Sequence, residues 1–192
     1  MAARDPKPSA RASASHVALL RGINVGGKRI VPMAALAAIF ESAGCSNVAT
    51  YIQSGNVVFS ASQSLAKNLP TLIPGRIGER FGFEPAVIVR SRRQMASIAA
   101  DNPFLAPGID HATLHVGFLA VTPKKQDTAR LDPNRSLGDR FALRGAEVYL
   151  HLPGGVGRTK LTSAYLDSTL ATTCTIRNWA TVLRLAGMLG VV

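Results

Sequence analysis

The stretch HVALLRGINVGGKRIVPM, residues 16–33, organises the rest of the chain. It runs from an apolar strand through a glycine-rich basic turn into a helix whose first turn carries Pro32. Glycine permits a positive φ and lets backbone N–H groups approach a ligand, while cations supply the complementary charge. The turn therefore predicts either an anion-binding site or a purely structural connection between strand and helix. Its candidate binding residues are Arg21, Asn24, Gly26, Gly27 and Lys28.

The letters GINVGGK at residues 22–28 satisfy the GxxxxGK spacing of a P-loop. A P-loop continues with Ser or Thr, whose hydroxyl binds magnesium, and its helix begins at the lysine. Here Arg29 follows the lysine, and Pro32 is better placed as the first helical residue. The next apolar strand, residues 86–90, ends in arginine instead of a metal-binding aspartate. The sequence therefore disfavours a P-loop and leaves a metal-free anion site as the functional interpretation.

The composition suits a globular protein that contacts phosphates. The chain has 192 residues, 47% of them hydrophobic, which is enough for one large domain or two small ones. It carries 22 Lys and Arg against 11 Asp and Glu, a formal net charge of +11. Such an excess favours polyanions through counterion release, although it equally suits a role in solubility alone. Residues 1–15 lack an apolar segment, so we expect a disordered leader and no secretory signal.

Several classes of function lack their sequence signals. Cys45 and Cys174 cannot build a disulfide framework and match no metal spacing. His111 and His115 have a metal-binding spacing only on a helix, whereas their segment is patterned as a strand. The sequence contains no GxSxG or HExxH motif, and no apolar run reaches the ~18–20 residues of a membrane span. We therefore expect a cytoplasmic protein with no metal, no cofactor, no membrane partner and no identifiable catalytic residue.

The first half of the chain predicts a βαββαβ order. We expect a strand at 16–21, a helix at 32–43 ended by Gly44, a hairpin at 47–60 turning at 54–56, and a strand at 86–90. Pro70 and Pro74 are expected to interrupt the helix at 64–82 and to leave a proper helix only from 74 to 81. This order is that of the ferredoxin-like plait, a split βαβ arrangement.

The second half predicts the same order again. A helix at 91–100 and a loop rich in Pro and Gly form an expected linker, 91–111. We then expect strands at 113–121, 140–144, 147–152 and 174–177, with helices at 124–131, 159–170 and 179–188. The predicted fold is therefore α+β, with two tandem ferredoxin-like (βαββαβ) subdomains at 16–90 and 112–192, the second ending in a C-terminal helix.

Six segments of the chain carry a resemblance to a known family. They are LLRGINVGGK (19–28), TYIQSGNVVFS (50–60), VIVRS (87–91), NPF (102–104), EVYLHLPGGVGRTKLT (147–162) and TIRNWATVLRL (175–185). Together they resemble a bacterial family known as the domain-of-unknown-function 1697 family, over essentially all of residues 16–189. Members look like tandem ferredoxin-like subdomains, so the resemblance implies the same double plait. It implies no activity, substrate or cofactor, and the leader lies outside it.

A second glycine-rich segment, LPGGVGRTK at residues 152–160, mirrors the first in composition. Its glycines precede an expected helix, and Arg158 and Lys160 accompany them. Exposed N–H groups and the helix dipole make such helix ends natural anion sites. The alternative is that the glycines only form tight turns while Thr159 caps the helix.

The segment TIRNWAT at residues 175–181 also has two interpretations. Arg177 beside an aromatic residue could bind phosphate while Trp179 stacks on a base. Alternatively, Asn178 caps the final helix and Trp179 packs into the core. We expect the core role for Trp179, and both roles stay open for Arg177.

Two functions follow from these observations. The first is an anion-binding module for nucleic acid or a nucleotide phosphate, formed by the two glycine-rich turns. The tip of the first hairpin completes this site with Gln53, Ser54 and Asn56. The alternative is an enzyme acting on a small phosphorylated or carboxylated metabolite, whose anion is clamped by Arg21, Lys28, Arg158 and Lys160. The strands lack the RRM signature, so an RRM-type mode of RNA binding is not expected.

Overall fold

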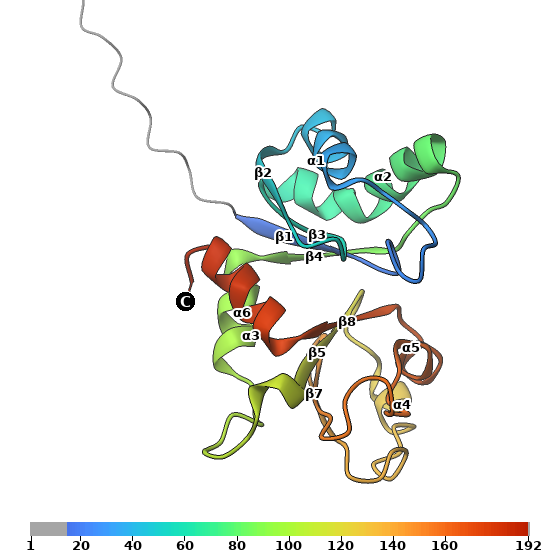
Figure 1. Ribbon diagram of the computed structural model, residues 1–192, viewed down its shortest axis with the longest axis vertical. Coiled ribbons are helices and arrows are strands. Elements are labelled where there is room, and N and C mark those ends of the chain that lie inside the picture. Colours follow the sequence, from blue (N-terminus) through green and yellow to red (C-terminus); the bar gives the residue numbers. More distant parts are fainter. Residues whose placement is uncertain (1–14, 192) are drawn as a thin grey trace, which may run out of the picture.

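Two four-stranded antiparallel sheets form the framework of the molecule (Figure 1). The computed structural model describes residues 15–191, so the expected leader lies outside the described residues apart from Ser15. The first sheet contains β1 (His16–Leu20), β2 (Ser46–Tyr51), β3 (Asn56–Ser60) and β4 (Val87–Ser91), in the order β2-β3-β1-β4. The second contains β5 (Leu114–Leu119), β6 (Arg140–Arg144), β7 (Glu147–His151) and β8 (Cys174–Asn178), in the order β6-β7-β5-β8. Both orders are those of a ferredoxin-like plait, which confirms the predicted fold class.

Helices cover both faces of each sheet (Figure 1). The outer face of the first sheet carries α1 (Met33–Ser42) and α2 (Gln63–Phe81), and that of the second carries α4 (Lys125–Thr128) and α5 (Ser163–Leu170). The helices α3 (Arg92–Ala100) and α6 (Trp179–Met188) pack together between the two sheets, and a short 3-10 helix, η1 (His111–Thr113), precedes β5. None of the described helices is both long enough and apolar enough to cross a membrane.

Each sheet and its three helices form a repeat of seven elements. We call β1–β4 with α1–α3 the first unit, and β5–β8 with α4–α6 the second unit. In each unit the last strand runs directly into the last helix, and the last strand residue caps that helix. Ser91 Oγ accepts from the N–H of Gln94, and Asn178 Oδ1 accepts from the N–H of Thr181 at 2.8 Å, as expected for Asn178. The segment expected as a linker, 91–111, thus contains a helix equivalent in position to α6.

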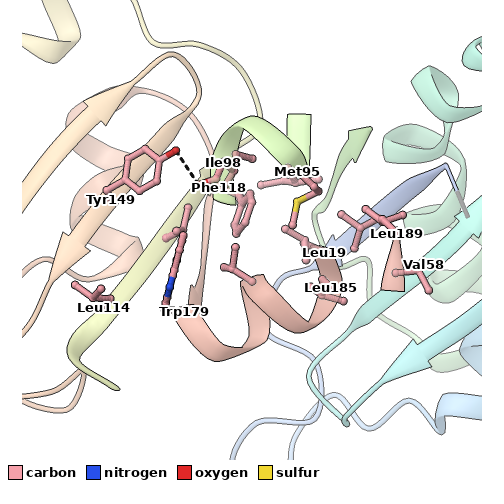
Figure 2. Close-up of a cluster of buried hydrophobic side chains, with 14 residues drawn as sticks. Leu19, Val58, Met95, Ile98, Leu114, Phe118, Tyr149, Trp179, Leu185 and Leu189 are labelled. Atoms are coloured by element: carbon pink, nitrogen blue, oxygen red, sulfur yellow. Dashed lines mark hydrogen bonds between the residues drawn. The ribbon is translucent and has the colours of Figure 1, made fainter. Parts of the chain in front are cut away.

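The two units share one hydrophobic core around α3 and α6 (Figure 2). Leu19 and Val58 enter it from the first sheet and Phe118 from the second, while Trp179 is 1% exposed at the start of α6. The role expected for Trp179 in the core is therefore confirmed. The hydroxyl of Tyr149 donates to the carbonyl of Ile98 at 3.3 Å, and burial is the main cause that raises the pKa of this tyrosine to about 12. Separate apolar clusters lie under the outer helices of each sheet.

The helix α2 is continuous, so the predicted break at Pro70 and Pro74 is wrong. A proline inside a helix costs about 3 kcal/mol because it removes a hydrogen bond and clashes with the preceding turn. The two prolines lie four residues apart on one face, where Pro70 is exposed. The same helix buries Ala66, Leu69, Ile73 and Ile77. Burial of these side chains offsets the prolines, and water can satisfy the carbonyls freed on the exposed side.

In the second unit the helix predicted from residue 159 begins only at Ser163. Thr162 is the N-cap, because its Oγ1 accepts from the N–H of Tyr165 at 3.2 Å. Thr159 instead uses its Oγ1 to accept from the N–H of Leu161 at 3.0 Å. Leu161 is 2% exposed and belongs to the core, and the helix begins only after this residue, with Thr162 in an extended conformation. The expected capping role of Thr159 is therefore wrong.

Candidate functional site

The glycine-rich segment after β1 forms a small hairpin, which we call the finger (residues 24–31). Val25 and Lys28 pair across it, and Gly26 and Gly27 form the turn with φ of 58° and 70°. Positive φ at both central positions is the geometry of a type I′ turn, which explains the two glycines. The helix α1 begins only at Met33, with Pro32 as its N-cap. The finger is therefore a β-ribbon that precedes α1, and it lacks the loop-to-helix geometry of a P-loop.

Asn24 fixes the finger to the tip of the β2–β3 hairpin (residues 52–55). Its Nδ2 donates to the carbonyls of Val31 and Gln53 at 3.0 and 2.9 Å, and its Oδ1 accepts from the N–H of Val31 at 2.7 Å. These bonds close the base of the finger and place it beside Gln53. We call the finger, this tip and the end of β1 the finger end of the first unit.

Arg177 of β8 lies buried beneath the finger end, with 9% of its surface exposed. Its Nε donates to Asn56 Oδ1 at 2.6 Å, and its Nη2 donates to the carbonyls of Leu20 and Ser54 at 2.8 and 3.0 Å. Its Nη1 donates within β8, to Thr175 Oγ1 and the carbonyl of Ile176. Burial lowers the pKa of Arg177 to about 10, so the guanidinium stays charged at neutral pH. All three guanidinium nitrogens are thus occupied, and Nε and Nη2 hold the second unit to the first.

Arg90 of β4 makes the reciprocal contact. Arg90 lies opposite Val17 as Arg177 lies opposite Val116, so the two arginines occupy equivalent positions. Arg90 Nη2 donates to the carbonyls of Leu119 and Ala146 at 2.6 and 3.2 Å, in the second unit. Its Nε donates to Glu147 Oε1 at 2.7 Å. Each arginine therefore reaches the end of the first strand of the other unit.

The partners of the two arginines differ in charge. Asn56 lies opposite Leu19, and Glu147 lies opposite Phe118, so these two acceptors are also equivalent. Glu147 carries a carboxylate that neutralises Arg90, whereas Asn56 offers Arg177 only an amide oxygen. The finger end therefore has a buried positive charge with no carboxylate partner, whereas the equivalent charge of Arg90 is neutralised.

Further cations surround this buried charge. Lys28 and Arg29 are exposed, and within residues 15–191 no acidic side chain forms an ion pair with either. The Arg29 guanidinium lies 5.8 Å from the centroid of the Phe83 ring, while Arg21 forms an ion pair with Asp167 of α5. The surface at the finger end is consequently basic.

Exposed aliphatic side chains accompany these cations. Val25, Ile30 and Ile52 are 66%, 55% and 52% exposed, although each would be expected in a core. Ile52 also has a φ of +47°, a conformation that β-branched residues rarely adopt. Such strain at an exposed tip is typical of functional positions.

The second glycine-rich segment lies elsewhere. Arg158 and Lys160 are exposed on it, and the N–H of Lys160 donates to Ser136 Oγ at 3.0 Å. In the described part of the chain no hydrogen bond or ion pair joins this segment to the finger. The structure thus separates the eleven candidate residues into two groups. Arg158 and Lys160 form one, and the finger end brings together Arg21, Asn24, Gly26, Gly27, Lys28, Gln53, Ser54, Asn56 and Arg177.

Neither thiol nor metal chemistry finds support among the described residues. Burial is the main cause that raises the pKa of Cys174 to about 12, and burial also raises the pKa of Cys45. Both cysteines are buried free thiols and therefore poor nucleophiles. No group of three or more His, Cys, Asp or Glu side chains in residues 15–191 is arranged to hold a metal ion.

Sequence reasoning missed two features. It considered His115 only for metal binding and rejected that role, whereas His115 lines a cavity beside the second glycine-rich segment. It also missed the pair Arg90 and Glu147, because these residues are 57 positions apart. The last strand of each unit has an arginine as its penultimate residue, in VIVRS and in TIRN. This shared position is the sequence signal that could have linked Arg90 to Arg177.

Comparisons with known proteins agree with this fold. The solved structure described as that of conserved bacterial protein SP0830 from Streptococcus pneumoniae is similar, with a TM-score of 0.64 and 23% sequence identity. The similarity covers 93% of this chain and 99% of that one and concerns the fold alone. Comparison with curated proteins yields no significant match. The model of a protein family described as "Protein of unknown function (DUF1697)" matches residues 14–149, which confirms the family that the sequence resembles over a shorter range than the expected 16–189. The chain therefore belongs to the DUF1697 family.

Proposed function

We propose that the protein binds nucleic acid through the finger end of the first unit. The observation that carries this proposal is the difference in charge between the two equivalent arginine sites. Arg90 is neutralised by Glu147, whereas Arg177 is left as a cation beneath a surface that also carries Lys28 and Arg29. Positive potential concentrated at one place attracts phosphates more strongly than the same charge spread over a surface.

The shape of the finger supports the same ligand. A two-stranded ribbon fits the major groove of DNA, which is about 12 Å wide, and short ribbons also serve as arms in grooves. Lys28 and Arg29 can contact phosphates from the ribbon, while the aliphatic side chains of Val25 and Ile30 are suited to sugars and bases. The two free thiols, Cys45 and Cys174, fit the reducing cytoplasm in which we propose that this binding takes place.

The direct test removes the exposed cations. The double variant Lys28→Ala/Arg29→Ala is expected to bind a labelled oligonucleotide at least about tenfold more weakly, because each charge-assisted hydrogen bond contributes about 1.5–3 kcal/mol. Fluorescence anisotropy with single- and double-stranded 20-mers, between about 50 and 200 mM salt, measures the effect. The slope of log K against log salt should become less steep by about 0.9 for each phosphate that the variant no longer neutralises.

The matched control is Lys124→Ala/Lys125→Ala, which removes the same charge from the exposed start of α4. We expect this control to reduce binding only slightly. Equal reductions in affinity for the two double variants would show diffuse attraction and contradict a site at the finger end. Absence of binding by the wild-type protein at about 50 mM salt would refute the nucleic-acid proposal altogether.

A second test addresses the buried charge itself. Asn56→Asp places a carboxylate against Arg177, as Glu147 does for Arg90. It removes the bonds that Asn56 Nδ2 donates to the carbonyl of Tyr51 and to Ser54 Oγ, at 3.2 and 2.9 Å. A unit charge about 10 Å from a phosphate, at an effective dielectric constant of about 40, changes the binding energy by about 0.8 kcal/mol, or about fourfold. We therefore expect about fourfold weaker oligonucleotide binding. Asn134→Asp, on an exposed loop of the second unit, is the matched control. Unchanged affinity in a folded Asn56→Asp protein would show that the charge of Arg177 does not contribute to oligonucleotide binding.

A further inference from the structure

A cavity of about 410 Å³ lies in the second unit, where β5 and β8 meet the second glycine-rich segment and the start of α5. Its polar lining residues are His115, Thr159, Thr162, Ser163 and Asn178, and no acidic side chain lines it. This volume is in the range of small-molecule sites. We call it the His115 cavity.

His115 of β5 lines this cavity. His115 is buried, with 7% of the residue's surface exposed. Its Nδ1 lies 3.2 Å from the carbonyl oxygen of Thr113. A carbonyl can only accept, so Nδ1 carries the hydrogen and the neutral ring keeps a lone pair on Nε2. No described group forms a hydrogen bond with Nε2, which is therefore left for a ligand.

Hydrogen-bond donors line the same cavity. The N–H of Ser163, at the first position of α5, has no partner within the helix, and the helix dipole adds positive potential there. Asn178 uses its Oδ1 to cap α6, so its Nδ2 remains a free donor. Ser163 and Thr159 add hydroxyl groups, and the exposed cations Arg158 and Lys160 flank Thr159 on the loop.

We propose that the His115 cavity binds a small organic oxyanion, a carboxylate or a phosphate monoester. Its anionic oxygens accept from the N–H of Ser163 and from Asn178 Nδ2, and one of them faces His115 Nε2. This site lies in the second unit and goes beyond the nucleic-acid surface proposed for the finger end.

Binding is linked to a proton at His115. Burial lowers the pKa of the free imidazole, and the bond to Thr113 opposes this effect, so the ring is neutral at pH 7 before binding. The charged groups on the surrounding segments are Arg158, Lys160, Asp167 and Arg177. Asp167 is already paired with Arg21, and Arg177 donates to Asn56 and Leu20 of the first unit. An oxyanion beside Nε2 favours the imidazolium, so Nε2 takes up a proton from solvent and becomes a donor. Affinity should therefore rise as pH falls through the pKa of His115 in the complex, and should level off below the pKa of the free protein.

The first unit supplies a matched control. A cavity of about 360 Å³ at the equivalent place is lined by His16, whose register with Ser91 corresponds to that of His115 with Asn178. His16 differs from His115 because its Nδ1 bonds to Ser15 Oγ at 2.7 Å and its ring stacks on Phe59. The second glycine-rich segment has no counterpart there, since α2 begins three residues after β3.

The experiment is an NMR titration of the histidine ring resonances of the full chain with inorganic phosphate and, separately, with malonate, at pH 6, 7 and 8. The His115 resonances should shift saturably, with a dissociation constant that decreases as pH falls, while those of His16 should not. Saturation by only one probe would assign the ligand class. No saturable shift up to about 50 mM of either probe, or equal shifts at His16 and His115, would overturn the proposal.

Two variants locate the contacts. Ser163→Pro removes one N–H at a position where proline is tolerated, and should weaken binding about tenfold without unfolding the protein. Thr162 is already extended at φ −76° and ψ 160°, as a residue before proline requires. His115→Gln cannot take up the proton and should abolish the pH dependence, whereas His16→Gln should leave it intact. Retention of the pH dependence in His115→Gln would contradict the assignment of Nε2.

Discussion

Replacing Arg177 with methionine is expected to lower the free energy of unfolding by about 3–5 kcal/mol, because several buried acceptors would lose their hydrogen-bond donor. Methionine fills most of the volume but donates no hydrogen bond. The carbonyls of Leu20 and Ser54 and the amide oxygen of Asn56 would then lose their donor in a buried setting. An unsatisfied buried acceptor costs about 1–3 kcal/mol, so these acceptors alone account for the effect.

Urea unfolding followed by circular dichroism and by fluorescence of Trp179, the only tryptophan of the chain, measures this decrease in stability. Arg93→Met is the matched control, because Arg93 is exposed on α3 and its removal should change stability by no more than about 0.5 kcal/mol. A decrease below about 1 kcal/mol for Arg177→Met would show that water replaces the arginine and that this side chain does not hold the units together.

Replacing Trp179 with alanine is expected to cost about 3–5 kcal/mol, the range for removing a large buried aromatic side chain. Trp179 is 1% exposed in the core shared by both sheets (Figure 2). The substitution should therefore destabilise both units together, and unfolding should remain a single transition. Hydrogen exchange of amides in β1 and β5, compared between the variant and the wild type, measures whether protection falls equally in the two sheets.

Leu137→Ala is the control for this prediction, because Leu137 is 91% exposed and its truncation should leave stability almost unchanged. Selective loss of protection in β5, with β1 unaffected, would show that the units fold independently despite their common core. That result would mean that residues 91–111 act as a simple linker between independent units.

Local signals explain why the order of strands and helices along the chain was predictable. The apolar run in β1 and the hairpin between β2 and β3 are properties of a few neighbouring residues, and both are present in the structure. The turn expected at 54–56 lies at 52–55, because Asn56 is the first residue of β3. Asn178 and Trp179 were predictable for the same reason, since a capping residue followed by a large apolar one marks the start of a helix.

Tertiary packing explains the errors. Nothing within α2 shows that burial of Leu69 and Ile73 outweighs the effect of Pro70 and Pro74. The late start of α5 likewise depends on where the core receives Leu161. Intrinsic propensity is a weak guide wherever packing decides.

The candidate site was predictable in composition but not in arrangement. The sequence indicated that the turn after β1 and the hairpin tip carry polar and basic residues, and Asn24 joins these two segments. It could not show that Arg177 binds Asn56, because these residues are 121 positions apart. It also could not show that the two glycine-rich segments are held by different parts of the fold.

The exchange of Arg90 and Arg177 has the form of an isologous contact, in which two subunits give each other the same residue. In a homodimer both copies of the acceptor would be identical, since a single gene encodes them. Here residues 101–110 join the halves covalently, so the two acceptors are free to differ, and they are Glu147 and Asn56. A covalently joined pseudo-dimer can thus hold one of its crossed contacts as an ion pair and leave the other with an unneutralised cation.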